Sequence, residues 1–453
     1  MATGYQRAAK YLQQLLGART CDDLRQRLAP KFGALPPNVP GGSLSTRDAV
    51  DNRWHILNAR AEARAAVADP GTLAELDRYD RCIEHFVGTV KVPVGVAGPL
   101  RVNGLFAQGD YYVPLATTEA ALVASYSRGA RLISEAGGAS ALLLNEGVGR
   151  APGFVFRTIR ESGEFVAWVL AQVEEFRRVA EGTTLHGRLE DVRLAVEGNH
   201  VYLHFEFKTG DAAGQNMVTL AAEAICRYIQ DHSPISPQAF FVEANFSGDK
   251  KASALSFLGV RGRKVSAEVL LPAELIRHRL HTTPKQMADY GQISTVGGVM
   301  SGTIGVQGHY ANGLAALYLA CGQDAACVAE SAVGVTRFEV DPRGGLYAAV
   351  TLPNLIVGTV GGGTSLPSQR ACLEILGLAG SGKAQALAEV CAALALAGEL
   401  SIVGALCAGE FARAHERLRQ WKKRGLACRP QQRRIAAGGS TSASASRCSP
   451  RGR

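Results

Sequence analysis

Apolar side chains recur at helical spacing in two stretches near the start of the chain. In residues 3–18 and 45–69 they return every three or four positions. A loop containing Pro36, Pro37, Pro40, Gly41 and Gly42 separates the two stretches. Either Ser45 or Thr46 is a suitable N-cap for the second stretch. The pattern therefore predicts a helical N-terminal domain over residues 1–83.

The pattern changes to short strands and turns at residues 86–104, FVGTVKVPVGVAGPLRVNG, and a compact module follows over residues 151–245. In that module we expect a strand in 153–160, a helix in 162–182, two strands joined at Glu197-Gly198-Asn199, a helix in 217–232 and a strand in 238–246. This β-α-β-β-α-β order is that of a ferredoxin-like sandwich. The module is inserted into a larger domain, residues 84–150 and 246–420, with further helices expected at 309–332 and 383–420.

Charge is concentrated at the end of the chain. Residues 421–453 hold nine lysines and arginines and no acid, which accounts for the formal net charge of +9 over 453 residues. This segment is rich in Ser, Ala, Gly and Arg, so it lacks the apolar surface needed for a core. We expect a basic disordered tail; a weak contact with an anionic surface is the alternative. No nucleic-acid partner is expected.

Hydropathy and cysteine use indicate an ordinary cytoplasmic protein. No apolar run reaches the roughly 18 residues of a membrane span, and the best candidate, residues 390–409, is interrupted by Glu399. The N-terminus lacks a secretion signal. The ten cysteines include no CxxC pair and no zinc-binding spacing, so free thiols and no metal site are expected.

A cluster of four glycines in six residues, Gly358–Gly363, precedes a predicted helix. The spacing is neither that of a dinucleotide-binding GxGxxG motif nor that of a P-loop. Glycines before a helix expose backbone N–H groups that suit a phosphate. Close packing of the helix against a sheet explains the cluster equally well, and the sequence leaves both interpretations open.

Five polar positions are further candidates, each with a structural alternative. Asp211 opens DAAGQNM and either caps a helix or accepts from a ligand hydroxyl. Lys250, beside Asp249, is either solvated or an oxyanion-stabilising cation. Glu119 is either a helix cap or, if its setting is apolar, a general acid with a raised pKa. Asp324 falls within an apolar predicted helix and needs a partner there, whereas His415 has the pattern of a surface histidine.

Seven segments stand in one order: FVGTVKVPVGVAGPL, PLATTEAALVASYSRGAR, GDAAGQNM, NFSGDKKA, GHYANGLAALYLACGQDAA, LPNLIVGTVGGGTSLPSQRACLEILG and LAGELSIVGALCAGEFARAH. Together they closely resemble 3-hydroxy-3-methylglutaryl-coenzyme A (HMG-CoA) reductase, over about residues 84–418. The GTVGGG segment is similar to the class that includes the eukaryotic and archaeal enzymes. The resemblance implies an α+β fold in which the large domain binds HMG-CoA and the inserted ferredoxin-like domain binds the nicotinamide nucleotide.

The implied reaction is the four-electron reduction of HMG-CoA to mevalonate and free CoA in the mevalonate pathway of isoprenoid synthesis. It uses two molecules of NADPH, and NADH is the alternative cofactor. Lys250 would stabilise oxygen charge, Glu119 would supply a proton, Asp324 would tune both, and His415 would protonate the CoA thiolate. The family builds its active sites across a subunit interface, which implies a homodimer or homotetramer.

The resemblance also implies binding residues. Those for the cofactor are Asp211, Ala213, Gly214, Gln215, Asn216, Met217, Val360, Gly361, Gly362 and Gly363. Those for the substrate are Ser125, Arg128, Arg131, Arg150, Asn245, Lys251, His309 and Asn312, of which Arg150, Asn245 and Lys251 would hold the HMG group and the others CoA.

Several positions depart from the family pattern. Ala213 and Gln215 stand in the usual DAMGMNM, Glu243-Ala244-Asn245 replaces SGN, and His85, His281 and Ile293 replace an asparagine and two lysines. Thr184-Leu185 replaces a Ser-Arg pair that recognises the 2′-phosphate of NADP, which leaves the choice between NADPH and NADH open. Two alternatives remain: a reductase of the same fold acting on another acyl-CoA or in the NAD-dependent oxidative direction, and a non-enzymatic binding protein.

Overall fold

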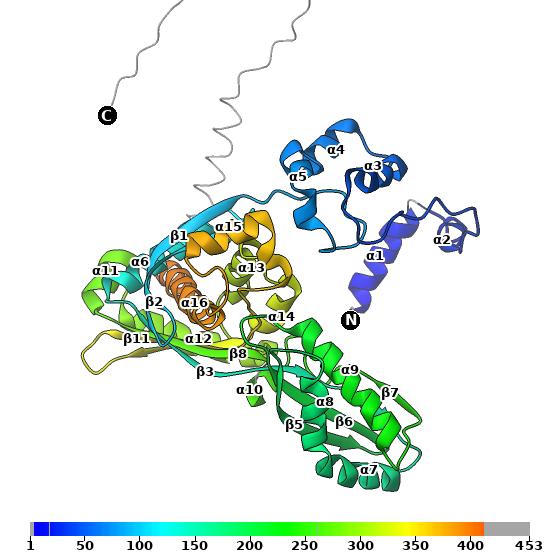
Figure 1. Ribbon diagram of the computed structural model, residues 1–453. Coiled ribbons are helices and arrows are strands. Elements are labelled where there is room, and N and C mark those ends of the chain that lie inside the picture. Colours follow the sequence, from blue (N-terminus) through cyan, green and yellow to red (C-terminus); the bar gives the residue numbers. More distant parts are fainter. Residues whose placement is uncertain (1–3, 18, 260, 412–453) are drawn as a thin grey trace, which may run out of the picture. The chain divides into compact units, whose positions relative to one another are not determined.

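The structure, a computed structural model, describes residues 4–17, 19–259 and 261–411 (Figure 1). It divides into two compact units, Met1–Val90 and Lys91–Arg453. The first unit extends past residue 83, where the sequence pattern placed its limit. The expected basic tail and His415 lie outside the described residues.

The N-terminal unit is helical, and a buried arginine holds the loop before α3 in place. Its helices are α1 (Tyr5–Gly17), α2 (Cys21–Leu28), α3 (Arg47–Ile56), α4 (Ala61–Val67) and α5 (Pro70–Ala74), followed by the 3₁₀ turn η1 (Leu76–Tyr79). Arg53 is fully buried and donates to the carbonyl oxygens of Pro40, Gly41, Gly42, Leu44 and Phe86. The guanidinium has five N–H donors, so one side chain can hold the whole proline–glycine loop against α3.

Thr46, one of the two expected N-caps, caps α3: its side chain accepts from the Ala49 N–H. The helical stretch expected over residues 45–69 is broken, because Leu57 takes an extended conformation at the end of α3 and α4 begins only at Ala61. Helical periodicity continues through the break, so the pattern alone did not reveal it.

The second unit is built on one mixed sheet. Its strands are β1 (Val94–Gly104), β2 (Gln108–Ala116), β3 (Ala139–Arg150), β4 (Gly153–Val155), β5 (Arg188–Glu197), β6 (His200–Lys208), β7 (Ala239–Phe241), β8 (Gly262–Leu271), β9 (Gly305–Val306), β10 (Gly334–Val340) and β11 (Leu346–Leu355). The order is β7-β4-β6-β3-β8-β11-β10-β9, with β5 on β6 and β1 between β2 and β3. The β1–β3 and β9–β10 pairs are parallel and the others antiparallel.

Strand β3 joins two parts of this unit. Its residues 140–147 pair with β8, and its last residues, Val148–Arg150, pair with β6. Two separate hydrophobic cores lie on either side of this junction. A residue at the end of β3, such as Arg150, is therefore held where the two parts meet.

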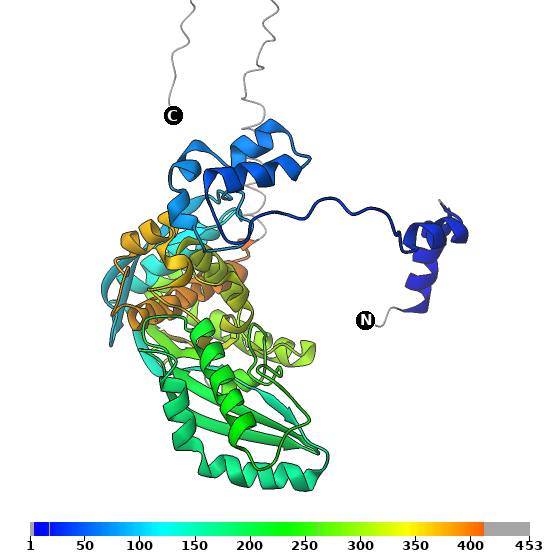
Figure 2. The ribbon, with the colours of Figure 1, turned by 45° about the vertical axis from the view of Figure 1, so that its right-hand side comes forward.

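The elements of the smaller part follow the expected strand–helix–strand–strand–helix–strand order. Strands β7, β4, β6 and β5 lie side by side and antiparallel, and the helices run along one face of them (Figures 1 and 2). The helices are α7 (Ile159–Ala171), α8 (Val173–Glu181) and α9 (Gln215–His232). The turn between β5 and β6 falls at Gly198-Asn199, as the sequence predicted.

Two expectations for this part were wrong in detail. The single helix expected over 162–182 is two helices that break at Gln172, so that Phe165 of α7 and Phe176 of α8 both reach the same core. The first strand is shorter than expected because Thr158 caps α7.

The larger part packs its remaining helices around a central one. They are α6 (Leu122–Glu135), α10 (Leu255–Leu258), α11 (Ala273–Leu280), α12 (Pro284–Ser301), α13 (Tyr310–Ala320), α14 (Val328–Ser331), α15 (Pro367–Leu376) and α16 (Ala384–Cys407), with 3₁₀ turns η2 (Ala325–Cys327) and η3 (Gly362–Ser365). The helix expected over 309–332 ends at Ala320, because Gly322 turns the chain with a φ of +67°.

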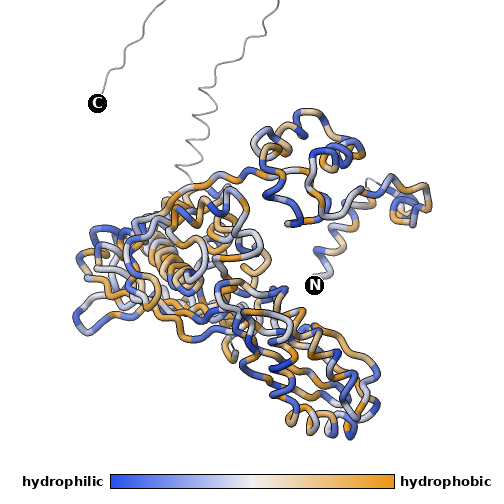
Figure 3. Tube along the Cα trace, viewed as in Figure 1, coloured by the Kyte–Doolittle hydropathy of each residue, from blue (hydrophilic) through white to orange (hydrophobic). Residues whose placement is uncertain are grey.

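Helix α16 is the core helix, and nearly its whole tube is apolar in Figure 3. By length and composition it is the one described helix that could cross a membrane, but 83% of its most apolar window is buried inside the protein. That burial favours a core role. Glu389, fully buried on α16, accepts hydrogen bonds from the N–H groups of Leu105, Phe106 and Ala107 and so fixes the β1–β2 turn.

Candidate active site

A pocket of about 560 Å³ gathers the glycine cluster and the DAAGQNM segment in one place. We call it the glycine pocket; its lining includes Ala212–Met217, Lys250, Gly322–Asp324 and Val360–Thr364. Four segments that are distant in the sequence thus converge. Nine of the ten residues that the resemblance assigned to the cofactor line this pocket.

The glycines of the cluster fall into two groups by their surroundings. A Cβ at Gly358 would lie 2.6 Å from the Ala213 backbone nitrogen, and one at Gly363 would lie 2.7 Å from the Gly322 carbonyl oxygen. These two glycines therefore permit close packing. Gly361 and Gly362 have φ values of +75° and +52° and face open space, so they shape the backbone at the pocket itself.

Replacing Gly358 with alanine is expected to lower the free energy of unfolding by about 1–3 kcal/mol, because the added methyl group meets backbone that cannot easily move. The matched control is Gly163→Ala on α7, where the new Cβ meets nothing within 4 Å and alanine gains helix propensity of up to about 1 kcal/mol. Urea unfolding of both variants measures the difference. Equal stability of the two variants would contradict the packing argument.

The N-terminus of α9 opens into the glycine pocket without a side-chain cap. Its N-cap is Gly214, in the left-handed conformation, so the first N–H groups of the helix have no capping side chain. Such a helix start favours an anion. Asp211 does not line the pocket; its carboxylate accepts from the N–H groups of Gly382 and Ala384 and so caps α16, not the following helix that the sequence suggested.

Lys250 and Asp324 form an ion pair in the wall of the glycine pocket, with 2.9 Å between Nζ and Oδ2. The hydrogen bond that Lys250 donates to Asp324 raises the pKa of Lys250. Partial burial opposes ionisation of Asp324, but the hydrogen bonds from Lys250 and the Ala326 N–H outweigh it and lower its pKa. Asp324 follows α13 rather than lying inside a helix, contrary to expectation, and it does have the partner that the sequence required.

A second pocket, of about 290 Å³, contains the other predicted acid. We call it the Glu119 pocket; its polar lining includes Glu119, Ser125, Arg128 and His309. Asn312 donates to Glu119 over 2.9 Å. Glu119 precedes α6 and is exposed, so the apolar burial expected for it is not provided by the single chain.

The Glu119 pocket is supported by buried polar contacts from α16. Glu399, only 1% exposed, accepts from the N–H groups of Gly308 and His309 and lies 3.4 Å from His309 Nδ1. Ser401 bonds to Ser125 and Arg128. Sequence reasoning treated Glu399 only as a break in an apolar run; an acid in the middle of that run was the signal that it has a specific partner.

The sequence profile of the hydroxymethylglutaryl-coenzyme A reductase family matches residues 49–420. The chain belongs to this family. Curated family members include the 3-hydroxy-3-methylglutaryl-coenzyme A reductases of Aeropyrum pernix, 45% identical over 347 residues, and Pyrococcus horikoshii, 43% identical over 345. These matches cover 75% of this chain and 82% and 83% of the relatives.

A solved HMG-CoA reductase of class II, from Streptococcus pneumoniae and bound to NADPH, shares the fold with a TM-score of 0.60 at 20% sequence identity. The structural alignment covers 76% of this chain and 95% of the Streptococcus pneumoniae chain. The sequence relatives include archaeal reductases and a plant one, that of Oryza sativa at 38% identity, in agreement with the class that the GTVGGG segment indicated.

The three described catalytic residues that the resemblance assigned to the HMG-CoA reductase site are divided between the two pockets, with Glu119 in one and Lys250 and Asp324 in the other. Asn312, which holds Glu119, lies in the first turn of α13, whereas Asp324 follows its last residue. At about 1.5 Å per residue, the 11 residues of α13 separate its ends by roughly 16 Å. One chain therefore does not bring Glu119 to the Lys250–Asp324 pair.

Five predicted substrate residues of the reductase are outside the lining of both pockets: Asn312, which bonds to Glu119, and Arg131, Asn245, Lys251 and Arg150. Arg131, Asn245 and Lys251 are exposed, and Lys251 donates to the Asp249 carbonyl oxygen. Arg150 is buried beside the glycine pocket, with Nη2 3.5 Å from the Gln215 carbonyl oxygen. Among the described residues of the reductase, no group of three His, Cys, Asp or Glu could hold a metal ion.

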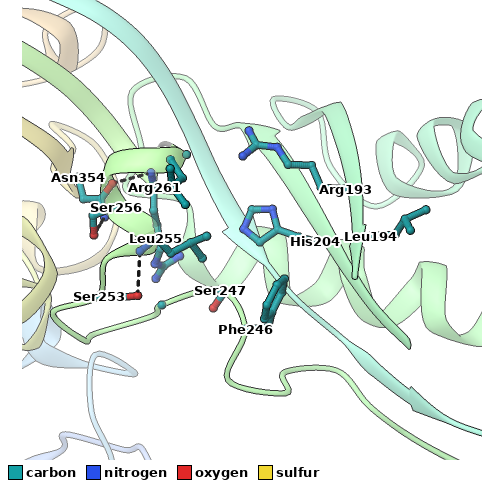
Figure 4. A pocket seen from close by; sticks show the side chains of 13 residues that line it. Arg193, Leu194, His204, Phe246, Ser247, Ser253, Leu255, Ser256, Arg261 and Asn354 are labelled. Atoms are coloured by element: carbon teal, nitrogen blue, oxygen red, sulfur yellow. Dashed lines mark hydrogen bonds between the residues drawn. The ribbon is translucent and has the colours of Figure 1, made fainter. Parts of the chain in front are cut away.

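A further cavity, of about 270 Å³, lies beside the loop that leads to Lys250 (Figure 4). Four apolar side chains, those of Leu194, Phe246, Leu255 and Leu258, line it together with polar ones that include Arg193, His204 and Arg261. Burial, reinforced by the charges of Arg193 and Arg261, lowers the pKa of His204 to about 4 and keeps the ring neutral. The resemblance to the reductases assigned no function to its lining residues.

Proposed function

We propose that this protein reduces HMG-CoA to mevalonate and free CoA with two molecules of NAD(P)H, in the mevalonate pathway of isoprenoid synthesis. The observation that carries the proposal is the Lys250–Asp324 ion pair in the wall of the glycine pocket. Membership of the HMG-CoA reductase family, over residues 49–420, supports it. The large part binds HMG-CoA in this proposal, and residues 151–245 form the inserted nucleotide-binding domain.

The glycine pocket fits a nicotinamide nucleotide. The uncapped start of α9 suits the negative charge of a pyrophosphate, and the open space at Gly361 and Gly362 lets a ligand approach the backbone. Two molecules of NAD(P)H, bound one after the other, would supply the two hydrides, the first to the thioester and the second to the aldehyde. Lys250, on the same wall, then stands where the carbonyl oxygen gains charge.

Lys250 stabilises that oxygen in the proposed reaction. Asp324 keeps its ammonium charged by raising its pKa, and a fixed cation at a developing oxyanion lowers the barrier. Asp324 also holds the ammonium in one position, through the 2.9 Å contact. Glu119 delivers the proton to the oxygen, and His415 protonates the departing CoA thiolate so that the thiolate cannot add back.

A second copy of the chain completes this site. Since Glu119 and the Lys250–Asp324 pair lie at opposite ends of α13, one carbonyl cannot reach both in a single chain. A two-fold interface that places the Glu119 pocket of one copy against the glycine pocket of the other solves this problem, and each dimer then has two equivalent sites. We therefore propose a homodimer, or a tetramer built from it, located in the cytoplasm.

NADPH is the proposed cofactor, and NADH is the alternative. The NADPH-bound reductase from Streptococcus pneumoniae supports NADPH. Thr184 lies beside the pocket, with its hydroxyl 2.9 Å from the sulfur of Met217. The neighbouring Leu185 is exposed and uncharged, so the pair offers no cation to a 2′-phosphate.

Purified full-length protein is expected to oxidise NADPH when HMG-CoA is added and to form mevalonate and free thiol, with two NADPH consumed for each mevalonate. Absorbance at the nicotinamide band, thiol titration and product chromatography measure this. The same assay with NADH gives the cofactor preference, and the reverse reaction with mevalonate, CoA and NAD tests the oxidative alternative. No nicotinamide turnover in either direction would contradict the proposal.

A further inference from the structure

Arg150 already carries two carboxylate partners inside the protein. It is 6% exposed, at the end of β3 where the two parts of the unit meet. Its Nη1 lies 2.9 Å from Asp249 Oδ2 and 3.2 Å from Glu243 Oε2. Asp249 directly precedes Lys250, and Gln215, whose carbonyl oxygen lies 3.5 Å from Arg150 Nη2, lines the glycine pocket, so this guanidinium lies directly behind the wall of the proposed active site.

The cationic groups around Arg150 do not outnumber the anionic ones. A second buried guanidinium, Arg261, pairs with Asp249 and with the fully buried Glu330. Glu330 in turn accepts from the Lys250 N–H. Three carboxylates, those of Glu243, Asp249 and Glu330, thus face two guanidinium groups. A further carboxylate, such as that of a ligand, would meet an Arg150 that is already paired with Glu243 and Asp249.

Glu243 is fixed on Arg150 by hydrogen bonds of its own. Its Oε1 accepts from the Asn245 N–H at 2.8 Å, and its Oε2 accepts from the Ser247 hydroxyl at 2.9 Å. Ser247 and Arg261 also line the neighbouring cavity, where Figure 4 shows both. The short serine of the usual SGN segment would leave the space beside Arg150 open; the longer glutamate reaches the guanidinium and takes that space.

From this geometry we infer that Glu243 is a specificity-determining residue: its carboxylate occupies the place on Arg150 that the free carboxylate of an acyl-CoA substrate would take. The inference rests on the proposed function, because it concerns the acyl end of that substrate. HMG-CoA must displace Glu243 or bind without a full ion pair to Arg150. The protein therefore binds an acyl-CoA with a terminal carboxylate more weakly than it would if Arg150 were not paired with Glu243. For the same reason it discriminates little against acyl groups that lack a terminal carboxylate.

Two variants test this inference. Glu243→Gln removes the charge and keeps the size, and Glu243→Ser also opens the space. Both are expected to tighten HMG-CoA binding by about tenfold or more, since a charged hydrogen bond to Arg150 becomes available to the ligand. Binding of 3-hydroxy-3-methylbutyryl-CoA, which lacks the terminal carboxylate, should change less than about twofold. Calorimetry gives the Kd values, and steady-state kinetics separate KM from kcat.

The matched control is Glu197→Gln at the β5–β6 turn, which removes the same charge from a side chain that is 84% exposed; it should leave both affinities unchanged. Thermal melting shows whether each variant is folded, and the retained Asp249 partner keeps Arg150 paired in both. Equal effects on the two thioesters, or weaker HMG-CoA binding in both folded variants, would overturn the inference while leaving the reductase proposal intact. Selective tightening without any turnover would instead support the inference and count against the reductase proposal.

Discussion

Lys250→Ala is expected to lower kcat for HMG-CoA reduction by about a thousandfold, the upper end of what removing one oxyanion-stabilising group costs. The ammonium is the nearest cation to Asp324 in the wall of the glycine pocket. Because the charge on the carbonyl oxygen develops only in the transition state, KM for HMG-CoA should change much less than kcat. Stopped-flow oxidation of NADPH measures the loss even when steady-state turnover is too slow to follow.

The control for this experiment is Lys285→Ala on α12. Lys285 also forms an ion pair with an aspartate, Asp289 at 2.8 Å, but its side chain is 77% exposed and lies outside both pockets. Its removal should change kcat by less than about twofold, because exposed pairs contribute little. Similar kcat values for Lys250→Ala and Lys285→Ala would contradict the proposed catalytic role of Lys250.

Mixing two inactive variants, Glu119→Gln and Lys250→Ala, is expected to restore activity. After unfolding and refolding together in equal amounts, half of the dimers contain one copy of each variant. In such a dimer one of the two sites receives an intact Glu119 from one copy and an intact Lys250 from the other. Specific activity should then recover to about a quarter of the wild-type value, as two-fold symmetry dictates.

The structure supplies a matched negative control for this mixture. Lys250 and Asp324 form their ion pair within one chain, so a mixture of Lys250→Ala with Asp324→Ala leaves every site incomplete and should recover no activity. Recovery in this second mixture, or none in the first although mixed dimers form, would contradict a site shared between two copies.

Local sequence patterns predicted most of the helices, strands and turns, because the formation of each of these elements depends on residues that are close in the sequence. The turn at Gly198-Asn199 and, apart from one broken helix, the order of elements in residues 151–245 were predicted correctly, and Thr46 is one of the two residues expected to cap α3. The breaks at Gln172 and Gly322 were missed. Both keep helical spacing on either side, and only the position of the core decides that the chain must turn there.

The site could be predicted only in part, for a related reason. The glycine cluster and Lys250 were visible as unusual local composition, whereas their convergence in one pocket joins segments more than a hundred residues apart. Asp211 illustrates the limit: its sequence context suggested a cap for the following helix, yet it caps α16. When a side chain has both a near and a distant possible partner, its hydrogen bonds can be assigned only from the structure, which shows whether folding brings the distant partner within range.

The sequence by itself determined which chemistry this protein can offer: an amine, two acids and a glycine-rich backbone, in an order that resembles HMG-CoA reductase. Only the tertiary structure decided which of those groups are free to act. It paired Lys250 with Asp324, set Glu119 at the other end of α13, and placed Glu243 on Arg150. Charge and hydrogen-bonding capacity are properties of a residue, but their availability depends on the partners that folding places within about 3 Å.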